Sequence, residues 1–183
     1  MTTETRRMTY EEYLEGPEIK GRFDIIDGVL IMAPSPTRKH QEILGQLYHL
    51  LRNFLDENHV GNAFIAPLDV VVEREPLKTR QPDLLFVSNE RSEILRDIVE
   101  GAPDLVVEVL SPSNSRADIQ DKLDDYLGLG VRECWLVSPE GRTVEVLTAA
   151  EDGWERASLI GVGDTVTSEV LEEFEVAVSD IFG

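Results

Sequence analysis

Residues 104–110 form a run, Asp-Leu-Val-Val-Glu-Val-Leu, that constrains the fold more than any other segment of the chain. In a β-strand, successive side chains point to opposite faces, so Glu108 would share its face with Val106 and Leu110. The other face of the run is wholly apolar. A strand that is apolar on both faces is typical of the interior of a sheet covered on both sides, and we therefore expect this run to be a buried central strand.

A helix and a second strand are predicted directly after this run. Ile119, Leu123 and Leu127 make one apolar stripe within residues 113–130, a spacing typical of an α-helix. Residues 133–137, Glu-Cys-Trp-Leu-Val, then read as a strand. The order strand, helix, strand indicates a parallel crossover connection.

The other periodic segments place this unit in a larger α/β (α+β) domain, with an N-terminal β-hairpin and a sheet in the middle of the chain. Asp27-Gly28 tolerates the positive φ angles of a tight hairpin turn. Pro- and charge-rich turns separate the middle strands, and an acidic tail follows. The expected elements are a helix at 10–14, hairpin strands at 22–26 and 29–32, a long helix ending near 58, strands at 63–66, 68–72 and 83–87, a short helix at 92–99, and a strand at 143–147.

Length and composition narrow the class of protein. A chain of 183 residues fits a single domain, 1–183, with no second core. No stretch reaches the roughly 18 consecutive apolar residues of a membrane-spanning helix, so we expect no membrane association. Cys134 is the only cysteine, which excludes an internal disulfide and favours the cytoplasm. The net charge of −19 should repel polyanions at long range.

Several common catalytic motifs are absent from the sequence, including a P-loop, H-E-x-x-H, G-x-S-x-G and paired cysteines. His40 and His49 would point to opposite sides of the long helix, and His59 lies beyond its end, so the three histidines are not expected to share a metal. Catalysis is therefore expected to use carboxylates and lysine.

Asp83 and Glu108 stand out because each lies in or next to a strand that otherwise appears buried. Burial raises the pKa of an unpaired carboxyl, so each group needs a cation, a hydrogen-bond donor or water. Each residue also has a structural interpretation. Glu108 could be a strand-end glutamate paired with an arginine, and Asp83 could cap a turn. If the two strands are neighbours, both carboxylates could hold Mg²⁺, which binds oxygen ligands and leaves positions for phosphate.

Lys122 is a candidate third member of this site. It lies on the predicted helix after the Glu108 strand, beside Ile119 and Tyr126 of the buried stripe. The alternative is a surface ion pair with Asp118 at i−4, worth only about 0.3–0.5 kcal/mol.

These residues and their surroundings resemble the Uma-two family of endonucleases, within the PD-(D/E)xK restriction-endonuclease-like superfamily. The resemblance spans nearly the whole chain. The matching stretches are 23–28, 34–40, 81–83, 107–113, 118–126 and 130–139.

The resemblance implies a restriction-endonuclease-like fold, in which a mixed central sheet is flanked by helices. It also implies that Asp83, Glu108 and Val109 bind Mg²⁺, with Mn²⁺ as a substitute. Leu110 occupies the usual position of the catalytic lysine, and the resemblance indicates that Lys122 replaces it from the following helix.

The implied reaction is hydrolysis of phosphodiester bonds in nucleic acid, and DNA is the expected substrate. A homodimer is the oligomeric state to test. The resemblance also covers Asp24 and His40. The family commonly has glutamate at the position of Asp24, which is interpreted as an additional acidic group of the site. The role of His40 is left open, and a structural histidine is one interpretation. The alternative functions are that of a catalytically inactive nuclease-fold protein that binds another protein and that of another metal-dependent hydrolase.

Overall fold

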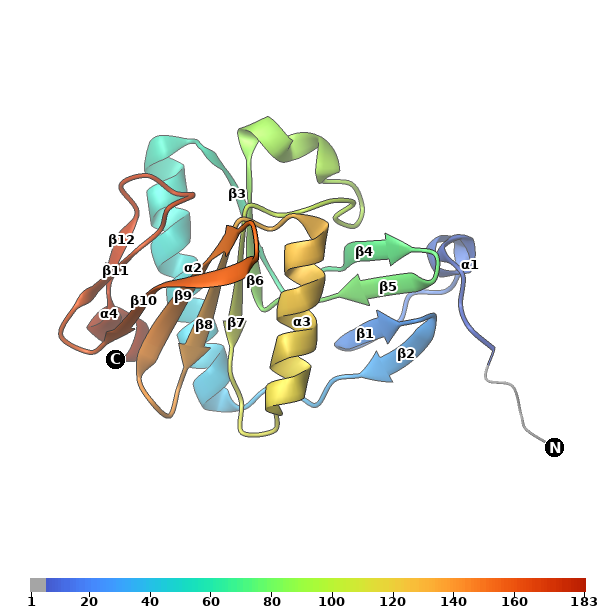
Figure 1. Ribbon diagram of the computed structural model, residues 1–183, viewed down its shortest axis with the longest axis horizontal. Coiled ribbons are helices and arrows are strands. Elements are labelled where there is room, and N and C mark those ends of the chain that lie inside the picture. The colour runs from blue at the N-terminus through green and yellow to red at the C-terminus, as the bar shows by residue number, and fades with distance from the viewer. Residues whose placement is uncertain (1–5) are drawn as a thin grey trace.

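The computed structural model describes residues 6–183, so the first five residues of the predicted domain lie outside it. A central six-stranded sheet forms its main layer (Figure 1). Its strands are β3 (Gly61–Ile65), β6 (Leu84–Ser88), β7 (Leu105–Val109), β8 (Glu133–Ser138), β9 (Thr143–Ala150) and β10 (Gly153–Gly161). They are arranged in the order β10-β9-β8-β7-β6-β3. Within the described residues, β7 and β8 are the one parallel pair, which confirms the predicted mixed sheet and the crossover.

Helices cover both faces of this sheet, as predicted. The long helix α2 (Arg38–Asn58) packs on one face, where Leu105, Val107 and Val109 of β7 join its core. Helix α3 (Arg116–Leu129) packs on the other face, against Val106. Figure 1 shows α3 in front of the strands and α2 behind them. Within residues 6–183, no helix is long and apolar enough to cross a membrane.

A second, four-stranded sheet carries the N-terminal hairpin. It consists of β1 (Phe23–Ile26), β2 (Val29–Met32), β4 (Val70–Arg74) and β5 (Leu77–Arg80), in the order β2-β1-β5-β4, beside helix α1 (Tyr10–Glu15). Asp27 and Gly28 have φ angles of 50° and 74°, which confirms the predicted hairpin turn. A side chain at Gly28 would come within 2.7 Å of the Met8 carbonyl oxygen, so this turn requires glycine.

Three segments differ from the prediction. Residues 77–80 were expected to lie in a turn, but they form β5 because Leu77 and Thr79 point inward between β1 and β4. A 3-10 helix at Asn89–Ile94 replaces the helix expected at 92–99. The acidic tail contains β10, a two-stranded sheet and a short helix. These last elements are β11 (Thr165–Thr167), β12 (Glu175–Ala177) and α4 (Val178–Phe182).

Candidate active site

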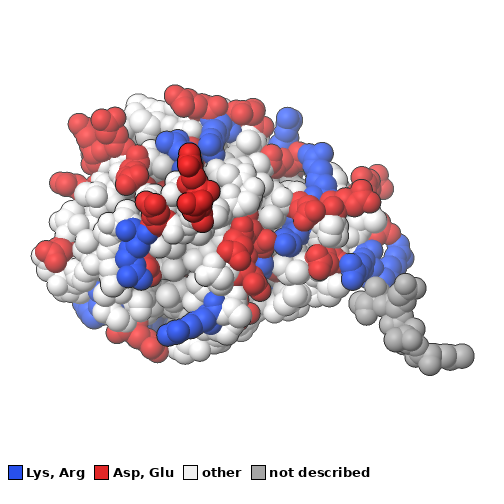
Figure 2. All heavy atoms as spheres, in the orientation of Figure 1, with Lys and Arg blue, Asp and Glu red and all other residues white. Residues whose placement is uncertain are grey.

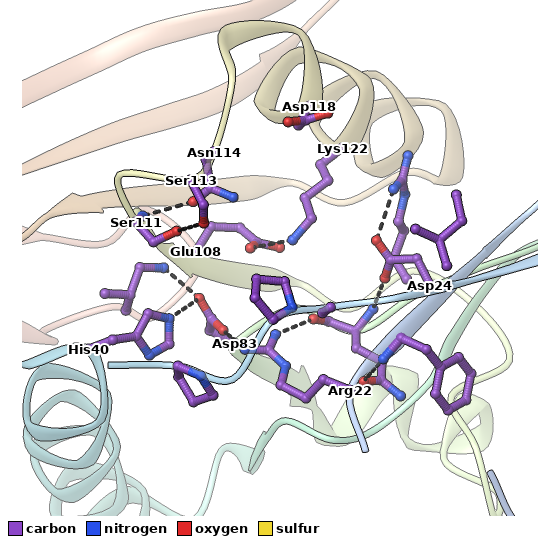
Figure 3. A pocket seen from close by; sticks show the side chains of 18 of the residues that line it. Arg22, Asp24, His40, Asp83, Glu108, Ser111, Ser113, Asn114, Asp118 and Lys122 are labelled. Atoms are coloured by element: carbon purple, nitrogen blue, oxygen red, sulfur yellow. Dashed lines mark hydrogen bonds and ion pairs between the residues drawn. The ribbon is translucent and has the colours of Figure 1, made fainter. Parts of the chain in front are cut away.

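A cavity of about 690 Å³ lies where the small sheet meets the central sheet. Asp83, Glu108 and Lys122 all line it, although they come from three segments of the chain (Figure 3). Asp83 immediately precedes β6, Glu108 lies near the end of β7, and Lys122 lies on α3. Because β6 and β7 are antiparallel neighbours, the start of one strand lies beside the end of the other. The fold thus brings the three predicted residues together.

The Asp83 carboxylate is almost completely enclosed, with a relative exposure of 2% for the residue. Its Oδ1 accepts a hydrogen bond from Arg22 Nη1 at 2.7 Å, and its Oδ2 accepts one from the backbone N–H of Val109 at 2.7 Å. His40 Nε2 lies 3.1 Å from the same Oδ2. Burial alone would raise the pKa of Asp83, but His40, Arg22 and the Val109 N–H together hold it below its ordinary value. Asp83 is therefore ionised at neutral pH.

Glu108 is also buried, but its partners come from α3. Its Oε2 accepts a hydrogen bond from Lys122 Nζ at 2.7 Å, and its Oε1 accepts one from the Tyr126 hydroxyl at 2.5 Å. Burial raises the pKa of Glu108, and the nearby charge of Asp83 adds to this effect, while Lys122 opposes it. The two carboxylates are thus close enough to influence each other.

Lys122 reaches into the cavity rather than pairing on the surface. The alternative in which it pairs with Asp118 is wrong, because the Asp118 carboxylate caps α3 and accepts hydrogen bonds from the backbone N–H and hydroxyl of Ser115. Burial alone would lower the pKa of Lys122, but the charge of Glu108 and their hydrogen bond raise it. The lysine is therefore held as a cation beside Glu108.

Asp24 lines the same cavity but belongs to an ion-pair network that joins the small sheet to α3. Its Oδ2 accepts a hydrogen bond from Arg80 Nη1 at 3.0 Å, and its Oδ1 accepts one from the backbone N–H of Gln81 at 3.1 Å. Arg80 also lies 2.6 Å from Asp125 Oδ2 on α3. Both oxygens of Asp24 thus bind the end of β5, and Arg80 in turn links the small sheet to α3.

The donor set of the cavity fits a divalent cation. An ionised carboxylate offers about four lone-pair positions, of which Asp83 uses three and Glu108 uses two in the contacts above. The lining carries five acidic side chains against three lysines and arginines, so it has an excess of negative charge for a cation to offset. Val109 can contribute only its carbonyl oxygen, since its side chain has no donor atom. Within the described residues, no cluster of three or more His, Cys, Asp or Glu side chains forms a complete metal site.

Sequence reasoning did not identify Arg22 as a site residue and placed Tyr126 only in the buried stripe. The i, i+4 spacing of Lys122 and Tyr126 puts both on one side of α3. This spacing could have indicated that Tyr126 belongs to the same site as Lys122. Arg22 lies far from Asp83 in the sequence, and only the packing of the hairpin beside β6 reveals their contact. His40, whose role the sequence left open, is a direct neighbour of Asp83.

Comparisons with known proteins agree with this architecture. No curated protein matches the chain. A solved structure, described as "a putative nuclease belonging to DUF820" from Anabaena variabilis ATCC 29413, superposes with a TM-score of 0.78 at 23% identity. The match covers 96% of this chain and 97% of that one, which confirms the fold. The model of the Uma2 family, described as "Putative restriction endonuclease", matches residues 10–179. The chain therefore belongs to the Uma2 family, as the resemblance in its sequence predicted.

Proposed function

We propose that the protein is a metal-dependent nuclease that hydrolyses phosphodiester bonds of nucleic acid, with DNA as the expected substrate. The observation that carries the proposal is the ion pair of Lys122 with Glu108 in the cavity that Asp83 also lines. A lysine from α3 thereby takes the place left apolar by Leu110. The family and the similar nuclease fold support the same reaction class.

Asp83 and Glu108 would hold Mg²⁺, or Mn²⁺ in its place, with the Val109 carbonyl as a further oxygen donor. When bound, such an ion lowers the pKa of water and offsets negative charge on phosphate. Arg22, His40 and the Val109 N–H keep Asp83 ionised and oriented. Asp83 is thereby held ionised at the place proposed for the cation.

Lys122 would stabilise the charge that develops on the attacked phosphate. An ammonium group has three N–H donors, and the hydrogen bond to Glu108 Oε2 uses one of them. The remaining donors can bind phosphate oxygens while Glu108 keeps the side chain in position. Tyr126 in turn orients Glu108 through its hydroxyl.

The second candidate is a catalytically inactive nuclease-fold protein that binds another protein. The specific observation in its favour is that every oxygen of both carboxylates already accepts a hydrogen bond from the protein, as in a closed structural network. The net charge of −19 also opposes binding of a polyanion. A homodimer and a cytoplasmic location remain predictions under either function.

The test is cleavage of labelled single-stranded and double-stranded DNA and RNA with Mg²⁺ or Mn²⁺. We expect the parent protein to cut at least one substrate and Asp83→Asn to lose nearly all of that activity. Asp104→Asn is the matched control, because Asp104 is a buried aspartate next to the same sheet. Within residues 6–183, it is not among the residues that line the cavity. Absence of cleavage by the folded parent on all four substrates would support the inactive alternative.

A further inference from the structure

One wall of the cavity is apolar and unusually exposed. Ile31 of β2 has a relative exposure of 51%, pairs across the hairpin with Asp24, and like Asp24 lines the cavity that contains Glu108 and Lys122. Ala33, followed by Pro34 and Pro36, continues this wall toward α2. Strand β2 lies at the edge of the small sheet, where exposed apolar side chains are a liability for aggregation. Their position at the mouth of the site indicates a ligand with an apolar face.

The opposite wall is polar. Ser111, Ser113 and Asn114, between β7 and α3, line it. The two hydroxyl oxygens lie 2.7 Å apart, and Asn114 Oδ1 accepts a hydrogen bond from the backbone N–H of Ser111. Hydroxyl and amide groups can bind sugar and phosphate oxygens. The cavity therefore combines an apolar wall, a polar wall and, between them, the proposed cation site.

The charge of the protein argues against a long contact with a nucleic-acid backbone. Duplex binding draws much of its affinity from many phosphate contacts with basic side chains. Here the chain has a net charge of −19, and acidic side chains outnumber basic ones in the cavity lining. On the face shown in Figure 2, blue basic side chains are interspersed with red acidic ones, with no continuous basic band. Affinity must therefore come from a short segment and from contacts other than phosphate.

We infer that the cavity takes an unpaired nucleotide, with its base against the wall of Ile31 and Ala33 and its phosphate toward Lys122. The substrate class of the site would then be single-stranded or locally unpaired nucleic acid rather than continuous duplex. This inference rests on the proposed nuclease function. The volume of about 690 Å³ lies within the roughly 300–1,000 Å³ of small-ligand sites. A base in an intact duplex is stacked on both faces and cannot offer one to this wall.

The test measures binding. Fluorescence anisotropy would compare a short labelled single strand, the same strand in a duplex, and a duplex with an unpaired internal loop, each with the parent protein in EDTA, which prevents metal-dependent cleavage and keeps Lys122. We expect the single strand and the looped duplex to bind at least about tenfold more tightly than the continuous duplex. The slope of log K against log salt should be shallow, at about −0.7 for each phosphate contacted.

Ile31→Ser, made in the parent protein, tests the apolar wall. It should weaken single-strand binding about fivefold, because it removes apolar surface from beneath the base. Leu159→Ser is the matched control, because Leu159 on β10 is 54% exposed, close to the 51% of Ile31, and within residues 6–183 it does not line the cavity. Circular dichroism would check that both variants fold.

The outcomes separate the two proposals. Duplex binding as tight as single-strand binding, or equal effects of Ile31→Ser and Leu159→Ser, would overturn the inference even if the parent protein cuts DNA. Single-strand binding that depends on Ile31, without cleavage by the parent, would support the ligand and remove the nuclease activity. Binding of none of the three probes would overturn the inference.

Discussion

The two ends of the central sheet both carry a pair of buried acids, but the pairs have different surroundings. At one end, Asp83 and Glu108 line the cavity. At the other, Asp104 precedes β7 and Glu133 begins β8, where β7 and β8 run parallel with Leu105 opposite Glu133. Asp104 is 1% exposed and Glu133 is fully buried, so burial alone does not distinguish the pairs.

The second pair is held by backbone groups and by charged side chains. Asp104 Oδ2 accepts a hydrogen bond from the backbone N–H of Ser88 at 2.8 Å, and its Oδ1 accepts one from Arg132 Nη1 at 3.2 Å and lies 3.4 Å from Arg91 Nε. Glu133 accepts one from the Trp135 indole at 2.6 Å and another from the backbone N–H of Glu169 at 2.6 Å. Within residues 6–183, the cavity lining includes neither acid. These carboxylates bind neighbouring loop backbone and lie away from the cavity.

The comparison shows that open space, rather than the kind of partner, distinguishes the two pairs, because Asp104 also pairs with arginine side chains and Asp83 also accepts a backbone N–H. Lys122 contacts Glu108 from a long, flexible side chain that can also reach a ligand. The predictions below test this difference between the cavity end and the closed end.

The largest effect is expected from Lys122→Met, which removes the cationic group at the cavity end and keeps a side chain of similar length. Cleavage should fall by about 10²-fold or more, the scale at which one positioned donor to the transition state matters. Single-turnover rates at saturating Mg²⁺ would measure it. Lys20→Met is the control, because Lys20 is exposed and, within residues 6–183, does not line the cavity. Full activity in a folded Lys122→Met protein would refute the role of the lysine.

Metal removal gives the next largest effect. An ion that binds the folded chain and not the unfolded one adds about 2.7 kcal/mol to the free energy of unfolding at one hundred times its Kd. Urea unfolding with Mg²⁺ or with EDTA should show this gain in the parent and in Asp104→Asn. Asp83→Asn should lose most of it. Equal gains in both variants would show that the two ends do not differ in metal binding.

Much of the fold was predictable because its strongest signals are local. The apolar stripe of α2 and the alternation in β7 each follow from a few neighbouring residues, and the structure confirms both. Strand β5 was missed because Lys78, Thr79 and Arg80 are polar in sequence, and only the surrounding strands show that Thr79 and Arg80 are buried. Strand β10 was missed because it lies at the edge of the sheet and carries little apolar periodicity.

The site was less predictable than the fold, because it depends on contacts between distant segments. By the criterion of an acid in an apolar strand, Asp104 and Glu133 qualify as well as Asp83 and Glu108 do. The local pattern and the family resemblance both pointed to Asp83 and Glu108, but the pattern alone did not exclude Asp104 and Glu133. The partners Arg22 and His40 come from the hairpin and from α2, and no local pattern connects them to Asp83.

The smallest expected effect is a pH dependence of opposite sign at the two ends. The pKa of Asp83 lies below its ordinary 3.8, because His40, Arg22 and the Val109 N–H outweigh burial. Its stabilising contribution is therefore present above about pH 4 and is lost as the pH falls through the lowered pKa. The pKa of Glu133 lies above its ordinary 4.5, because burial outweighs its hydrogen bonds. Its contribution is present below about pH 4.5 and is lost as the pH rises through the raised pKa.

Urea unfolding in EDTA between about pH 3 and pH 7 would separate these contributions in Asp83→Asn and Glu133→Gln, each compared with the parent. The difference in unfolding free energy between the parent and Asp83→Asn should shrink as the pH falls. The corresponding difference for Glu133→Gln should shrink as the pH rises. One titrating group changes stability by at most about 1.4 kcal/mol per pH unit, so both trends are gentle. Parallel trends would mean that the charged partners around Asp83 do not outweigh its burial, and the electrostatic contrast between the two ends would then disappear.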